Sequence, residues 1–148
     1  MKRAAWLRVA LCGLVAGVVW YLLTVVSIAL SAPDLIASVQ SRAPHAAHGG
    51  GFFFTLDMLM GIWAVWLYSA LAPRYGARVT TGAIAGVAWW AMKTLQSAKW
   101  AGLGFVEFSG GLVLVGAMTL VAAVLASMVG AWLYDKVDVP ATEKLPAS

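Results

Sequence analysis

Four long stretches of mostly apolar residues alternate with polar segments along the chain, at about 9–30, 52–72, 80–98 and 112–134. A helix needs about 20 apolar residues to cross the roughly 30 Å of hydrocarbon in a bilayer. The pattern therefore predicts an all-α integral membrane protein with four transmembrane helices. We expect one membrane domain over residues 1–148, with a polar outer loop at 31–51 and a mobile C-terminal tail at 135–148.

The first apolar stretch allows a second interpretation, because it follows the basic residues Lys2, Arg3 and Arg8, as in a secretory signal peptide. Ala29–Ser31 would serve as a cleavage site. The apolar part of a signal peptide is about 7–15 residues long, however, and this stretch is longer. We therefore favour an uncleaved first helix over a cleaved signal.

Composition supports a membrane protein, since 62% of the residues are hydrophobic and only 11% are charged. The net charge of +4 does not indicate nucleic-acid binding, because the basic residues lie singly or in pairs beside apolar stretches. No predicted span contains a histidine to ligate haem, and no nucleophile, base and acid occur together, so we expect neither a cofactor nor an enzyme. His45 and His48 are weak metal candidates in the outer loop, where a solvated loop is the favoured interpretation.

The basic residues predict the orientation of the chain in the membrane, because cytoplasmic flanks are enriched in Lys and Arg. Only Arg42 and Lys99 fall on one side, and the other side, which takes both termini, carries Lys2, Arg3, Arg8, Arg74, Arg78, Lys136 and Lys144. Both termini should therefore be cytoplasmic. Pro73 is expected to end the second helix, and Gly76 to allow the turn after it. The expected anchors at the membrane interface are Trp66, Tyr68, Trp132, Tyr134, Arg74 and Arg78.

One segment occurs twice in near copy. Gly13–Thr24 aligns without gaps with Gly82–Lys93, at an offset of 69 residues, and the shared ending of the second and fourth stretches gives an offset of 66. This predicts a tandem repeat of one two-helix hairpin, with the copies related by a pseudo-twofold axis along the membrane normal. The alternative is chance recurrence of residues that are common in membrane helices.

Small residues recur at helical spacing and predict where helices pack closely, because glycine lets two backbones approach. Gly13 and Gly17 form a Gly-x-x-x-Gly motif in the first helix, and Gly82 and Gly86 form another in the third. We expect these two helices to contact each other across the pseudo-axis. Further packing positions are Gly61, Ala122, Ala126 and Gly130, and any of these small faces could instead meet another protein.

Two charged residues interrupt the apolar stretches, Asp57 in the second and Lys93 in the third. Counted along each helix at 1.5 Å per residue, both residues lie roughly 8 Å below the outer boundary of the membrane. In two neighbouring antiparallel helices they would therefore lie at the same depth. Because an isolated charge at this depth costs about 3 kcal/mol or more, we predict an ion pair between them. The alternatives are snorkelling of Lys93 to the outer interface, or a proton or ion relay.

The segment from Trp66 to Gly76, the repeated Ala-Gly-x-x-Trp element and the ending Gly130–Tyr134 resemble a group of small bacterial four-helix membrane proteins of unassigned function. The resemblance implies a bacterial inner membrane location and no catalytic residues. We interpret the chain as a non-enzymatic packing or accessory subunit of a larger membrane complex, with lipid and a protein partner or a second copy as its neighbours. The alternative is a small dimeric transporter or channel with its pathway near Asp57 and Lys93.

Overall fold

The computed structural model describes residues 3–31, 50–102 and 110–137. These residues form four α-helices: α1 (Arg3–Ser31), α3 (Gly50–Tyr75), α4 (Val79–Gly102) and α5 (Gly110–Lys136). No strand occurs among the described residues, so the predicted all-helical class is confirmed for them. His45 and His48 lie outside the described residues, as does most of the expected outer loop.

Every helix is longer than the apolar stretch that predicted it. Pro73 does not end α3, as we expected, but lies in its last turn, and the helix continues to Tyr75. A proline there costs only one hydrogen bond, to a carbonyl one turn earlier. The turn itself is at Gly76, whose φ of 88° fits the expectation for glycine. The helix α5 also includes Asp135 and Lys136, which we had assigned to the mobile tail.

Three of the helices are long and apolar enough to cross a membrane, over Ala5–Leu30, Phe54–Tyr75 and Val113–Lys136. The fourth, α4, is long enough but less apolar. Its C-terminal half carries Lys93, Gln96 and Lys99, and all three side chains are exposed.

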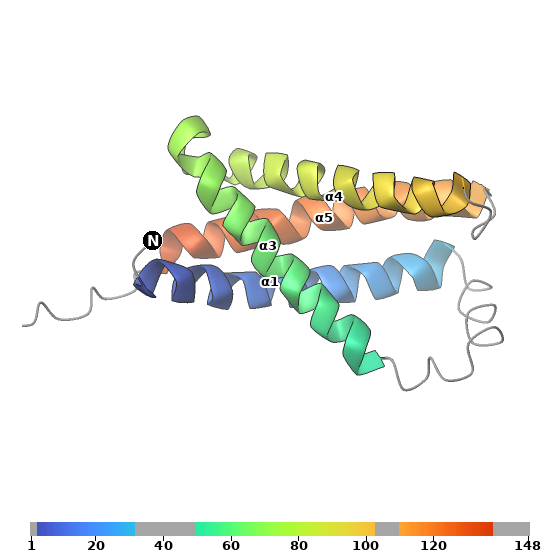
Figure 1. The fold of residues 1–148 in the computed structure, drawn as a ribbon, viewed down its shortest axis with the longest axis horizontal. Helices are drawn as coiled ribbons and strands as arrows, with labels where there is room; N and C mark the ends of the chain where they lie inside the picture. The colour runs from blue at the N-terminus through green and yellow to red at the C-terminus, as the bar shows by residue number, and fades with distance from the viewer. Residues whose placement is uncertain (1–2, 32–49, 103–109, 138–148) are drawn as a thin grey trace, which may run out of the picture.

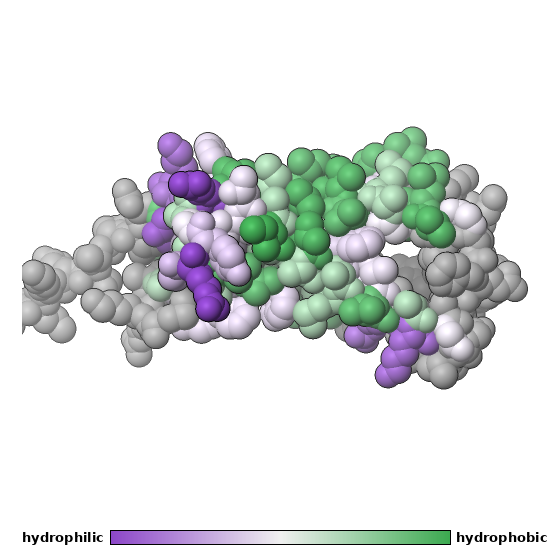
Figure 2. All heavy atoms as spheres, turned by 90° about the horizontal axis from the view of Figure 1, so that it is seen from above, coloured by the Kyte–Doolittle hydropathy of each residue, from purple (hydrophilic) through white to green (hydrophobic). Residues whose placement is uncertain are grey.

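The helices α1, α4 and α5 run roughly along one direction, and α3 crosses them obliquely (Figure 1). The start of α1, the end of α3, the start of α4 and the end of α5 all lie at the same end of the bundle. Strongly hydrophilic residues gather at this end, next to a broad hydrophobic stretch (Figure 2). The exposed Arg74 and Arg78 belong to this end.

The glycine motifs pack within each hairpin, which corrects our expectation that the first and third helices would pack through them. A Cβ atom at Gly17 would lie 2.8 Å from Cα of Met58 in α3, and one at Gly86 would lie 2.8 Å from Cα of Val124 in α5. The backbones of α1 and α4 do not approach each other. A glycine motif marks a close approach of two helices, and it does not say which helix comes close.

A second set of contacts joins α1, α3 and α5 at the basic end. The Arg8 guanidinium lies 4.4 Å from the centre of the Tyr134 ring and donates to the Tyr134 carbonyl. The Tyr68 hydroxyl donates to Oδ2 of Asp135 at 2.7 Å. Tyr68 is fully buried and meets Tyr134 edge-on, so it packs the bundle and is not the exposed interface anchor that we expected.

Candidate functional site

Trp20 of α1 contacts both charged residues that interrupt the apolar stretches, Asp57 and Lys93. Its indole N–H donates to Oδ1 of Asp57 in α3 at 3.0 Å. The ammonium of Lys93 in α4 lies over the same indole ring, 4.5 Å from its centre. Trp20 is 1% exposed, and it meets the half-buried Asp57 on one side and the ammonium of the otherwise exposed Lys93 on the other. One tryptophan thus connects three helices through a hydrogen bond to an anion and a cation–π contact.

Asp57 and Lys93 are brought together at this tryptophan, where each lies within electrostatic reach of the other. The predicted direct ion pair stays a prediction, and Trp20 is the residue that contacts both groups. Leaving water costs a charged group less free energy when it keeps a favourable contact. The carboxylate accepts an indole hydrogen bond, and the ammonium faces an aromatic ring. The arrangement is therefore a means of holding two opposite charges beside the apolar core of the bundle.

Asp57 lies deeper than the residue count along α3 suggested. The Asp57 carbonyl lies next to Gly17, which is near the middle of the span Ala5–Leu30. Counted along α1, Gly17 is about 20 Å inside Leu30. The count along α3 gave a smaller depth because α3 crosses α1 obliquely (Figure 1).

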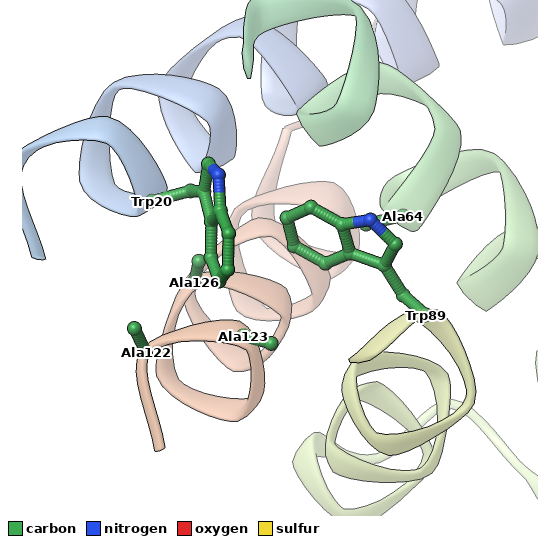
Figure 3. Close-up of a cluster of buried hydrophobic side chains, with 6 residues drawn as sticks. All are labelled: Trp20, Ala64, Trp89, Ala122, Ala123 and Ala126. Carbon is green, nitrogen blue, oxygen red and sulfur yellow. The ribbon is translucent and has the colours of Figure 1, made fainter. Parts of the chain in front are cut away.

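The core beside the charges is filled by a second tryptophan. Trp89 of α4 meets Trp20 with ring centres 4.4 Å apart and the planes tilted by 54°. The two rings project from α1 and α4 toward each other over the small residues of α5 (Figure 3). The buried cluster consists of Trp20, Ala64, Trp89, Ala122, Ala123 and Ala126.

Several buried polar atoms near this cluster have no hydrogen-bond partner among the described residues: Trp89 Nε1, Thr24 Oγ1 and Ser127 Oγ. Trp89 is only 3% exposed, so its N–H is shielded on all sides. The indole nitrogens of Trp20 and Trp89 both lie on the side away from the alanines of α5 (Figure 3). Of these two nitrogens, only that of Trp20 donates a hydrogen bond to a carboxylate.

Residues that are separated by the sequence offsets of 69 and 66 make similar contacts. Gly13 packs on Ile62 and Gly82 packs on Met128, where 82 is 13 plus 69 and 128 is 62 plus 66. The aromatic pairs Trp20–Trp89 and Tyr68–Tyr134 each join two residues at these same offsets. The position that corresponds to Asp57 is Ala123, and the one that corresponds to Lys93 is Thr24.

The remaining predicted packing residues face the interior. A Cβ atom at Gly61 would collide with the α1 backbone at Gly13 and Gly17, and one at Gly130 would lie 2.6 Å from Val65. Ala122 and Ala126 are buried against Trp20. These small faces therefore serve packing inside the bundle. Trp66 and Trp132 are exposed, as expected for anchors.

Sequence reasoning found the two charges but missed Trp20. An indole N–H is a hydrogen-bond donor that a buried carboxylate can use, and the tryptophan is repeated in both halves, which was the available signal. The described residues contain no group of three or more His, Cys, Asp or Glu side chains that could hold a metal ion.

No family model, curated protein or solved structure matches this chain.

Proposed function

We propose that this protein is a non-enzymatic subunit of a larger membrane assembly, which it joins through its outer surface. The observation that carries the proposal is the contact of Trp20 and Trp89, with ring centres 4.4 Å apart. A transport pathway along the axis between the hairpins would run where these rings lie. A filled interior leaves the outer surface of the bundle as the part that interacts with other molecules.

The exposed outer half of α4 supports a protein neighbour. Gln96 and Lys99 are exposed on α4, which is less apolar than the other three helices. Lipid chains solvate such side chains poorly, whereas a neighbouring protein can offer hydrogen bonds. This is the surface on which we place the contact with the assembly.

We also propose that the bundle arose by duplication of one hairpin and that both of its termini are cytoplasmic. Two copies of one hairpin account for the matching offsets of 69 and 66 residues and for the like-with-like aromatic contacts. The basic residues at one end favour cytoplasmic termini by the positive-inside rule. The resemblance to small bacterial four-helix membrane proteins favours the bacterial inner membrane as the location.

Purification of the tagged protein from its native membrane in a mild detergent tests this role. We expect a partner protein to be retained in a fixed molar ratio, and the complex to keep that ratio through a second, orthogonal purification step. A benzophenone amino acid at Gln96 should crosslink to the same partner, whereas one at Leu11, on the exposed face of α1, serves as the control. A protein that purifies alone or only as a homodimer contradicts the proposal.

A proton pathway is the second candidate, and one observation favours it. The buried and unpartnered atoms Trp89 Nε1, Thr24 Oγ1 and Ser127 Oγ belong to three different helices, α4, α1 and α5. Polar atoms inside a membrane bundle often line water-filled routes. This candidate requires proton flux that depends on Asp57.

A further inference from the structure

Three exposed basic residues lie at the end of the bundle where α3, α4 and α5 meet. Arg74 is in the last turn of α3, Arg78 comes directly before α4, and Lys136 is the last residue of α5. All three side chains are exposed. The three helices are packed together near this end, because one buried cluster takes a residue from each of them: Tyr68, Ala85 and Ala131.

The turn between α3 and α4 carries two of these residues, Arg74 and Arg78, and hydrogen bonds hold its backbone. The Gly76 N–H donates to the Ala72 carbonyl at 2.8 Å, and the Thr81 hydroxyl donates to the Gly76 carbonyl at 2.8 Å. The Arg78 side chain folds back over the turn, since its Nε lies 3.8 Å from the position of a Cβ atom at Gly76. Two guanidinium groups are therefore carried by one short, fixed turn.

Acidic residues of the described part of the chain do not balance these charges. Residues 3–31, 50–102 and 110–137 contain two carboxylate side chains, Asp57 and Asp135. Asp57 accepts from an indole inside the bundle, and Asp135 accepts from the Tyr68 hydroxyl at 2.7 Å. None of the three exposed basic side chains forms an ion pair with either carboxylate. This end of the bundle therefore presents a net positive surface that attracts an anion.

The position of the basic surface favours a lipid over a soluble anion. The apolar spans Phe54–Tyr75 and Val113–Lys136 both end beside it, so the cations lie at the border of the hydrocarbon, where a bilayer has its phosphates. Strongly hydrophilic residues at this end adjoin a broad hydrophobic stretch (Figure 2). Trp66 and Trp132 are exposed on that apolar side of the border. A phospholipid can use both parts of this surface, whereas a free phosphate ion can use only the charges.

We propose that Arg74, Arg78 and Lys136 form a binding surface for the headgroup of an anionic phospholipid. The guanidinium groups donate paired hydrogen bonds to the phosphate, and the acyl chains lie along the apolar helix faces. A zwitterionic headgroup carries a cation of its own, which these residues repel, so the net charge of the lipid decides its affinity. The inference depends neither on the role of the protein in an assembly nor on which side of the membrane this end faces.

Binding of radiolabelled phosphatidylglycerol to the immobilised full-length protein in detergent, followed by scintillation proximity, tests the proposal. Unlabelled phosphatidylglycerol should displace the label, and phosphatidylcholine with the same acyl chains should not at equal concentration. Arg74→Gln and Arg78→Gln should each weaken binding about fivefold, the usual effect of one basic residue near an anionic surface. Arg74→Lys and Arg78→Lys should lose less, because they keep the charge. Lys99→Gln, which removes an exposed lysine of the opposite end, is the matched control and should bind as tightly as the unaltered protein.

Three results would overturn the proposal. The first is equal displacement by the two lipids, which would show that the headgroup charge is not recognised. The second is a loss in Lys99→Gln as large as that in the arginine variants, which would show that the site is not at this end. The third is displacement of the lipid by inorganic phosphate beyond that by chloride of the same ionic strength, which would identify a free phosphate as the ligand. The lipid and phosphate competitions use the unaltered protein, so they decide the matter even if a variant does not fold.

Discussion

Trp20 and Trp89 face each other with ring centres 4.4 Å apart, yet only Trp20 donates its indole N–H to a carboxylate. The two residues occupy corresponding positions in the two hairpins. Their surroundings differ because α3 has Asp57 where α5 has Ala123. The carboxylate that accepts an indole N–H is therefore present in α3 and absent from the aligned position of α5.

This difference predicts unequal effects of the same substitution. Trp20→Phe should lower the free energy of unfolding by about 1.5–3 kcal/mol, because it removes a hydrogen bond to a charged group. Trp89→Phe serves as the matched control and should lower it by less than about 1 kcal/mol, since no protein acceptor is lost. Reversible unfolding in mixed detergent micelles measures both values. Equal losses would show that the hydrogen bond to Asp57 contributes little.

The two charges should depend on each other. Asp57→Asn and Lys93→Met should each destabilise the solubilised protein, because each removes one of the two opposite charges that meet at Trp20 and leaves the other uncompensated there. The double variant should recover part of the loss, with a coupling free energy of about 0.5–3 kcal/mol, the usual range for interacting neighbours. Asparagine keeps an oxygen for the Trp20 N–H, so the cycle isolates the charge. Losses that simply add would refute the coupling.

Close packing of α1 on α3 should make Gly61 intolerant of a methyl group. In Gly61→Ala the new Cβ would meet the backbone of Gly13 and Gly17, which can move aside only by separating the helices. We expect a loss of at least about 1–3 kcal/mol, as for other overpacked sites. Gly116→Ala is the control, because nothing lies within 4 Å of its Cβ position. That variant should be neutral or more stable by up to about 1 kcal/mol, since alanine is the better helix former.

Corresponding glycines should respond alike if the hairpins are copies. The Cβ of Gly17→Ala would lie 2.8 Å from Cα of Met58, and that of Gly86→Ala would lie 2.8 Å from Cα of Val124. Both contacts are with backbone, so neither can be relieved by a side-chain rotation. The two variants should therefore lose stability by amounts that agree within about 0.5 kcal/mol, the usual scatter between independent sites. A loss at only one of them would count against equivalent packing.

The sequence was sufficient to predict the helices, because length and apolarity decide which segments cross a bilayer. Residue counts along the helices were also sufficient to predict that Asp57 and Lys93 lie near each other, and both contact Trp20. The prediction that α1 and α4 pack through their glycines was wrong, because a helix face made of small residues suits any neighbouring helix equally well.

The role of Trp20 depended on information that the sequence does not hold. The angle and position at which α3 crosses α1 determine which residues of the two helices lie opposite each other. That crossing brings the Trp20 N–H to Asp57. A tryptophan in an apolar helix is usually a packing or interface residue, so its type alone does not identify it as a donor to a charge. Repetition of the residue at positions 20 and 89 was the only available indication.

Proton flux into liposomes tests most directly the claim that the interior is closed and that the protein acts through its outer surface. The purified protein is reconstituted with a pH-sensitive dye inside the vesicles, and a potassium diffusion potential drives proton entry. We predict that proton entry equals that of protein-free liposomes, and that Asp57→Asn and Lys93→Met leave it unchanged. Entry above the protein-free rate that either substitution abolishes would contradict the account and establish a pathway past Trp20.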